Sequence, residues 1–135
     1  MPISDPKAKA ADPAIPRQTR KVIDYLDITP TRFPAPAVDT SGRVVIGKAD
    51  GAVNFCMRVI EFAAGGETSL HSHPWEHEQF VHQGVGQIFI EDRWFDVGPG
   101  SVVFVPSGVT HQIKNTGDTS LLFVCLVPPF APELL

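Results

Sequence analysis

Turn-forming residues interrupt the chain every few positions from residue 53 onward, which limits this part to short secondary-structure elements. Glycine, proline or aspartate recurs between short apolar segments, and no stretch carries apolar residues at the period of an amphipathic helix. The pattern predicts eight strands, at Val53–Phe62, Ser69–His73, Gln79–Gln83, Val85–Glu91, Trp94–Val97, Ser101–Val105, His111–Asn115 and Leu121–Val127. Many short strands at close spacing are typical of an all-β sandwich or barrel.

The first 50 residues differ from the rest in composition. They hold seven of the 13 prolines, and proline disrupts both helices and central strands. We therefore predict an extended N-terminal arm with edge strands over residues 1–50, in which Val44–Ile46 is one pairing segment, and a barrel domain over residues 51–135. All five histidines lie in the second part, so we expect the chemistry there.

Composition excludes several classes of protein. The 135 residues suffice for one domain with one core, and no apolar run is long enough to cross a bilayer. The first residues lack the apolar stretch of a secretory signal, and Cys56 and Cys125 show no ligand or disulfide spacing. We therefore predict reduced, buried cysteines and a cytoplasmic location. A net charge of −4 disfavours nucleic acid and anionic lipid as partners. The partner we expect is a small-molecule substrate.

The segment from His71 to Glu78 carries the chemistry. Residues at i and i+2 of a strand point to one face, so His71 and His73 would present two imidazoles to one point. Beyond the turn at Pro74, His77 or Glu78 offers a third ligand. A further histidine, His111, starts another predicted strand, and ligands from separate strands converge when a sheet curls into a small barrel.

These residues resemble the two sequence motifs of the cupin superfamily. The first motif is matched by Gly65, His71, His73 and Glu78, with Gly84 one position earlier than the usual closing glycine. The second motif is matched throughout, by Gly100, Pro106, Gly108, His111 and Asn115. The resemblance covers about residues 53–128 and leaves the N-terminal arm outside.

The resemblance implies a double-stranded β-helix, or jelly-roll, barrel that binds a divalent metal through His71, His73 and His111. The run is similar to that of the small four-histidine manganese cupins of the cupin 2 type, which makes His77 the fourth ligand, whereas other cupins use the glutamate that Glu78 matches. Adjacent strand residues point to opposite faces, so only one of the two faces the metal. We predict His77, with Glu78 as the alternative. The family favours Mn or Fe, and the ligand types also suit Zn, Ni, Co and Cu.

Other side chains on the predicted strands are candidates for the substrate pocket. We expect Phe80, Phe89 and Phe104 to contribute to an apolar wall. Arg58 is either an anchor for a substrate carboxylate or a solvated strand residue. Because His82 matches neither motif, we expect it to be an ordinary core histidine.

An open metal coordination sphere marks a reactive site, and the family resemblance implies an oxidoreductase of dioxygenase or oxidase type. The same site would also suit a lyase, isomerase or decarboxylase, or a protein that binds a small molecule without catalysis. Because small cupins often pair through sheet edges, we expect a homodimer.

Overall fold

A computed structural model describes residue 18 and residues 20–134. The elements in chain order are the short 3-10 helix η1 (Tyr25–Asp27), β1 (Thr31–Arg32), β2 (Val38–Ile46), η2 (Lys48–Asp50), β3 (Cys56–Glu67), β4 (His77–Gln83), β5 (Gly86–Ile90), β6 (Arg93–Val97), β7 (Val102–Val105), β8 (His111–Asn115) and β9 (Leu121–Val127). The expected all-β fold is confirmed. In this part of the chain, no helix has the length and apolar character needed to cross a membrane.

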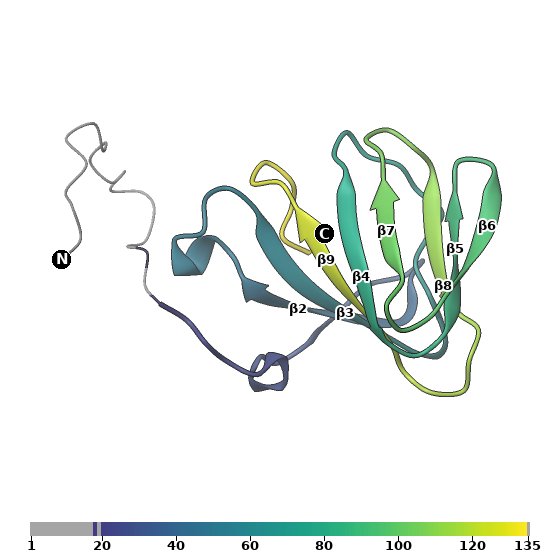
Figure 1. The fold of residues 1–135 in the computed structure, drawn as a ribbon, viewed down its shortest axis with the longest axis horizontal. Helices are drawn as coiled ribbons and strands as arrows, with labels where there is room; N and C mark the ends of the chain where they lie inside the picture. The colour runs from purple at the N-terminus through teal and green to yellow at the C-terminus, as the bar shows by residue number, and fades with distance from the viewer. Residues whose placement is uncertain (1–17, 19, 135) are drawn as a thin grey trace.

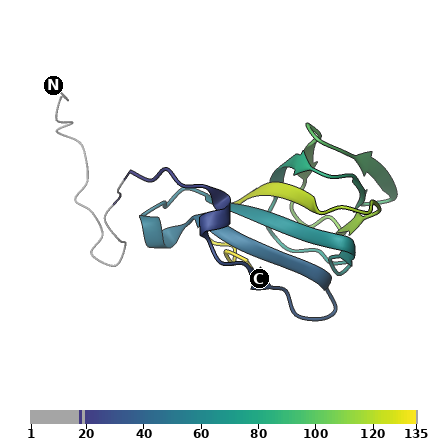
Figure 2. The ribbon, with the colours of Figure 1, turned by 90° about the horizontal axis from the view of Figure 1, so that it is seen from below.

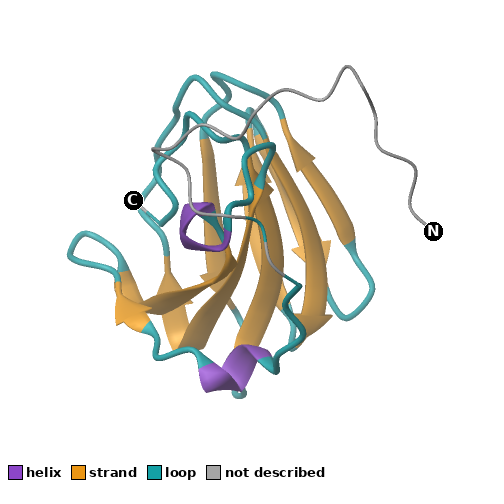
Figure 3. Ribbon diagram, turned by 90° about the vertical axis from the view of Figure 1, so that its left-hand side faces the viewer, coloured by secondary structure: helices purple, strands orange, loops and turns teal. Residues whose placement is uncertain are grey.

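The strands form one curled sheet in the order β6-β5-β8-β3-β9-β4-β7, with β2 on the free side of β3 and β1 paired to β2 (Figure 1). Every pairing is antiparallel. Seen from below, β2 and β3 run side by side as one layer (Figure 2), and from the end the strands curve around a common interior (Figure 3). The arrangement is the expected jelly-roll barrel.

Strand β3 belongs to both halves of the barrel because it bends near its end. Phe62 still pairs with Leu121 of β9, whereas Glu67 pairs with Lys114 of β8. Between them Gly65 has a φ of +78°, a conformation that favours glycine. At Gly66, a Cβ atom would approach the Ala63 carbonyl oxygen to 2.8 Å. The Gly65-Gly66 pair therefore permits the bend that closes the barrel.

The side chain of Asn115, the last residue of β8, fastens this bend. Its Nδ2 donates to the carbonyl oxygens of Phe62, Ala63 and Thr119 at 2.9, 3.1 and 2.8 Å, and its Oδ1 accepts from the Gly117 amide at 2.9 Å. Asn115 is buried, and its bond to the Phe62 carbonyl replaces water that cannot reach this part of the core. One amide thus connects β3, β8 and the turn that follows β8.

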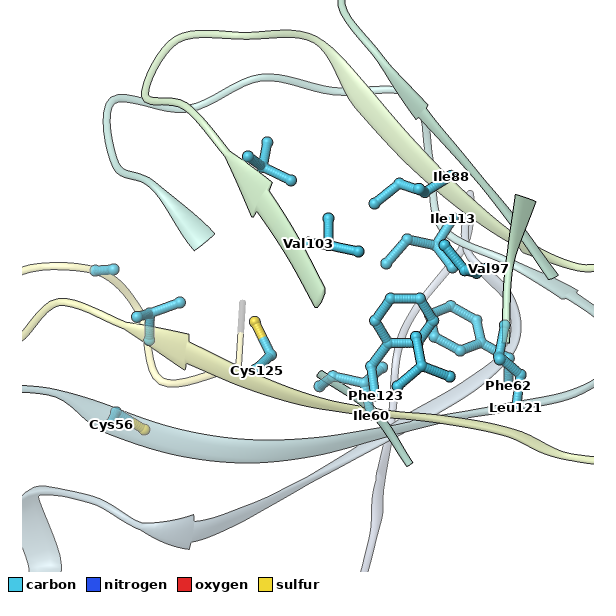
Figure 4. Close-up of a cluster of buried hydrophobic side chains, with 14 residues drawn as sticks. Cys56, Ile60, Phe62, Ile88, Val97, Val103, Ile113, Leu121, Phe123 and Cys125 are labelled. Atoms are coloured by element: carbon cyan, nitrogen blue, oxygen red, sulfur yellow. The ribbon is translucent and has the colours of Figure 1, made fainter. Parts of the chain in front are cut away.

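Apolar side chains from both halves of the barrel meet in the interior (Figure 4). Phe62 and Phe123 are fully buried and pack edge to face with ring centroids 5.9 Å apart. Ile88 and Ile113 approach them from β5 and β8. Cys56 and Cys125 are also buried and form no disulfide, as predicted.

The described part of the N-terminal arm packs on its own barrel. Tyr25 and Ile28 cover the outward residues Val45, Val59 and Leu122 of β2, β3 and β9. Arg43 lies over the Tyr25 ring at 5.5 Å, and its Nε donates to the Ile28 carbonyl at 2.8 Å. The sheet also extends further toward the N-terminus than the Val44–Ile46 cluster suggested, since β2 begins at Val38. The part of the arm formed by residues 1–17 and 19 lies outside the described residues.

Replacing Asn115 with alanine should destabilise the fold by about 2–4 kcal/mol, because the buried Phe62 carbonyl and the partly buried carbonyls of Ala63 and Thr119 would lose their donor. Asn115→Asp should be similarly destabilising at neutral pH, since a carboxylate cannot donate. Urea unfolding followed by circular dichroism would measure both changes, with the exposed Asn54→Ala as the control. Equal stability of Asn115→Ala and Asn54→Ala would contradict the proposed role.

Candidate metal centre

Four histidines from three segments converge inside the barrel. His71 follows β3 and pairs with His111 at the start of β8, each amide donating to the other's carbonyl at 3.1 and 2.9 Å. One ring nitrogen from each of His71, His73 and His111 lies within 4.8 Å of the others. His77 opens β4, and its Nε2 lies 2.9 Å from Nε2 of His73. His71 and His73 face one point as predicted, although their segment forms an isolated bridge in place of the expected strand.

Backbone carbonyls fix the proton position on three of these rings. The Nδ1 atoms of His71, His73 and His111 lie 2.7, 2.9 and 2.9 Å from the carbonyl oxygens of Ser69, Trp75 and Val109, respectively. Because a carbonyl only accepts, each Nδ1 carries the proton and each Nε2 keeps a free lone pair. This arrangement holds neutral imidazoles ready as metal ligands.

The fourth ring has a sulfur atom in the equivalent place. Nδ1 of His77 lies 3.3 Å from Sγ of Cys125 on β9, and both residues are buried. A thiol can donate or accept, so Cys125 is compatible with either tautomer of His77. When His77 Nε2 acts as a ligand, Nδ1 carries the proton and donates to the sulfur, while the thiol proton can turn toward the Leu126 carbonyl at 3.8 Å.

The histidines fit a divalent ion. Nε2 of His111 is buried and has no hydrogen-bond partner within the described part of the chain, which is costly unless a ligand uses its lone pair. Two imidazole nitrogens at about 2.1 Å from one ion and at right angles would lie about 3 Å apart, close to the 2.9 Å between His73 and His77. Four neutral nitrogen donors suit borderline divalent transition metals.

Burial keeps the cluster neutral. It lowers the pKa of His77 to about 2, with the charge of Arg58 as the second cause, and lowers the pKa of His111 to about 4. Burial is also the main cause of the lowered pKa of His73. These lowered pKa values favour the neutral forms of His73, His77 and His111, which metal binding requires.

A cavity of about 400 Å³ opens beside the cluster. Trp75 stacks on His73 with ring centroids 4.2 Å apart and forms one wall. The other walls are mainly apolar, and no aspartate or glutamate lines the cavity among the described residues. The enclosed site thus suits an apolar body with polar groups directed toward the histidines.

Arg58 lies in this cavity wall and is buried, contrary to a solvated strand position. Its Nη1 donates to the carbonyls of Glu133 and Leu134 at 3.2 and 3.3 Å, and its Nη2 donates to Sγ of Cys125 at 3.0 Å. Gln79, one inward position along from His77, also donates to this sulfur at 3.5 Å. Cys125 therefore connects a buried cation to the histidine cluster.

Several predicted site residues lie elsewhere. Glu78 is exposed, on the face of β4 opposite to His77. Phe80 and Phe104 are 47% and 54% exposed on the outer surface, so they do not form the expected pocket wall. Phe89 packs on Trp94 and is also absent from the cavity lining. His82 is exposed beside Tyr25 and is not the expected core residue.

Sequence reasoning missed the segments that enclose the cavity. Residues 33–37, between β1 and β2, and the tail residues Pro132 and Leu134 line it. The prolines and the phenylalanine of the Phe33–Ala37 segment gave a local signal of an ordered apolar turn. Nothing in the sequence indicated that this turn and the tail meet over the same cavity.

The metal-free protein should lose stability as the pH falls from about 6.5 to about 4. Unfolded histidine takes up a proton near the upper limit, whereas His111 in the fold resists protonation down to the lower one. The unfolded chain therefore binds more protons in this window. Thermal unfolding of EDTA-treated protein should show the fall, reduced in His111→Asn and unchanged in the exposed His82→Asn. A fall that is equally steep in His111→Asn would contradict this explanation.

Comparison with known proteins agrees with this geometry. The cupin domain family Cupin_2 matches residues 58–127. Protein SchB of Streptomyces halstedii is 26% identical over 117 residues, covering 86% of this chain and 83% of SchB. An uncharacterized protein of Methanocaldococcus jannaschii, MJ1618, is 30% identical over 71 residues, which is 51% of this chain and 57% of that protein.

Among solved structures, the polyketide cyclase RemF from Streptomyces resistomycificus superposes with a TM-score of 0.78 at 30% identity. The match covers 86% of this chain and 84% of that structure. The family match spans more than half of the chain and contains His71, His73, His77 and His111. The chain therefore belongs to the cupin domain family Cupin_2.

Proposed function

We propose that the chain is an enzyme that holds one divalent metal on His71, His73, His77 and His111 and acts on a small oxygen-rich molecule. One observation carries the proposal: the Nε2 atoms converge beside a cavity while an acceptor occupies each Nδ1. A structural role would need no adjoining apolar cavity. Glu78, exposed on the opposite face, takes no part in this proposal.

Manganese or iron is the metal we propose, in keeping with the family. A bound ion would act as a Lewis acid on a carbonyl or enolate oxygen, and four neutral ligands would leave its charge uncompensated. The chain itself supplies the remaining conditions. The cavity lining is mainly apolar, and Trp75 adds a flat aromatic side chain to one wall.

The reaction we propose is ring closure of a substrate with several carbonyl groups. The similarity to the polyketide cyclase RemF supports this class because it extends over most of both chains. The flat Trp75 wall and the largely apolar lining would suit a planar, conjugated product. The second candidate is the oxidoreductase that the family resemblance implied, favoured by the all-histidine, uncharged donor set.

Two measurements test this proposal in sequence. Elemental analysis should find about one ion per chain in the wild type, and His77→Ala and His111→Ala should lose it. Glu78→Gln is the matched control and should retain the ion. Loss of the ion from Glu78→Gln but not from His77→Ala would overturn the ligand assignment, and absence of metal from all would overturn the metal-dependent function.

Mass spectrometry then distinguishes the reactions. The metal-loaded protein incubated with a linear poly-β-ketone should yield a cyclised product that has lost water, without uptake of dioxygen. A product that gains oxygen atoms while dioxygen is consumed would replace cyclisation with the oxidoreductase reaction. His111→Ala should abolish either product.

We further infer a cytoplasmic homodimer. The two buried, unpaired cysteines are consistent with a reducing compartment. Strand β7 lies at one end of the sheet path, and its outward Val102 and Phe104 are 81% and 54% exposed next to Phe80 of β4. Such an apolar patch on an edge is typical of an interface.

Light scattering should report a mass of twice 14.7 kDa for the wild type. Phe104→Lys should give monomers with unchanged circular dichroism, because a charge on the patch opposes its burial. The exposed Phe130→Lys, in the C-terminal tail, is the control and should remain dimeric. A monomeric wild type, or a dimeric Phe104→Lys, would contradict this interface.

A further inference from the structure

The cavity wall holds a cation, Arg58, that has no counter-ion among the described residues. Arg58 is 6% exposed and lines the cavity. Within the described residues it forms no ion pair with a carboxylate. Glu133 accepts from the Lys48 amide at 2.9 Å through its carboxylate and from Arg58 through its backbone carbonyl. Buried charges are normally paired, so an uncompensated guanidinium beside a cavity favours an anionic ligand.

Two polar atoms at this place also lack hydrogen-bond partners among the residues that the structure describes. Nε of Arg58 is a buried donor with no acceptor, and Oε1 of Gln79 is a buried acceptor with no donor. Both side chains line the cavity, and both donate to Sγ of Cys125 through their other nitrogens. A ligand that carries an anionic oxygen next to a hydroxyl group would satisfy both atoms at once.

The side chains of Arg58 and Gln79 lie next to the histidine cluster. The sulfur of Cys125 lies 3.0 Å from Nη2 of Arg58 and 3.3 Å from Nδ1 of His77. The unpaired donor and acceptor therefore adjoin the histidine cluster, with a single sulfur atom between guanidinium and imidazole. A molecule held by Arg58 and Gln79 would extend from there toward the histidines along the apolar walls.

We propose that Arg58 and Gln79 form a subsite for an oxyanion with a neighbouring hydroxyl, such as a hydroxycarboxylate. That the bound molecule is the enzyme's substrate rests on the proposed function. Binding of the anion requires only the side chains described, and so it is measurable without metal. Gln79 selects the hydroxyl, and Arg58 supplies the charge-assisted hydrogen bond.

Salicylate is a suitable probe, since it carries a carboxylate and a hydroxyl on one planar ring. Calorimetric titration of the EDTA-treated full chain should show saturable binding at millimolar concentration. Its affinity should exceed that of neutral 2-hydroxybenzamide by about tenfold or more, the ratio that one charge-assisted hydrogen bond gives. Benzoate, which lacks the hydroxyl, should bind more weakly than salicylate.

Gln79→Glu is the sharpest variant because it is nearly isosteric and places a carboxylate beside Arg58. It should fold and should lose the preference for salicylate, since the new carboxylate neutralises the guanidinium. Arg58→Met should lose the same preference, provided that circular dichroism shows it folded. Arg43→Met is the matched control, because Arg43 is also buried but packs on the Tyr25 ring and does not line the cavity.

Equal affinity for salicylate and 2-hydroxybenzamide, unchanged salicylate binding by folded Gln79→Glu, or no saturable binding by the wild type would each overturn the subsite. The metal analysis keeps this result separate from the proposed function. A chain that binds no metal but loses its salicylate preference in Gln79→Glu would retain the anion subsite and refute the metal enzyme. Stoichiometric metal with no selective salicylate binding would support the metal site and refute the anion subsite.

Discussion

The bend of β3 between Phe62 and Glu67 is the constraint on which the site depends. A straight strand of twelve residues would continue in one sheet, and the segment with His71 and His73 could not cross to His111. Glycines allow the bend, and the buried amide of Asn115 fixes it with three carbonyl bonds. The second motif thus contributes both a site histidine and, four residues later, the side chain that fastens the sheet around the histidines.

The charges around the cavity determine which ligands it favours. Burial opposes protonation of His77 and His111, and the carbonyl acceptors at Nδ1 of His71, His73 and His111 leave their Nε2 lone pairs free. Arg58 adds a positive charge that no described carboxylate neutralises. A divalent ion would increase this positive charge, so the enclosed space favours anionic oxygen ligands over neutral ones. Cys125 links the two halves of this arrangement through its sulfur.

The positions of the four histidines were accessible from the sequence because local rules govern them. Motif spacing identified His71, His73 and His111, and strand alternation indicated that His77 and Glu78 face opposite sides, as they do. The same alternation places Phe80 outward whenever His77 faces inward, so those two predictions were incompatible. Phe104 pairs with Glu78 across β4 and β7 and shares its outward face.

The remaining features depend on contacts between distant segments, which one sequence does not reveal. A solvated strand position was one of the two predictions for Arg58. It was wrong because the C-terminal tail folds over this side chain and buries it. The cavity wall of residues 33–37 comes from an arm that lies outside the family motifs. In both cases, the local sequence around a side chain does not indicate its role, because that role depends on contacts with residues distant in the sequence.

The central claim is that four imidazole nitrogens, with no carboxylate from the chain, hold a metal beside the cavity. X-ray absorption spectroscopy of the manganese-loaded protein tests it most directly, because multiple scattering from imidazole rings reports their number. The account predicts four imidazoles in the wild type and in Glu78→Gln, and three in His77→Ala. Three imidazoles in the wild type, unchanged in His77→Ala, would contradict it.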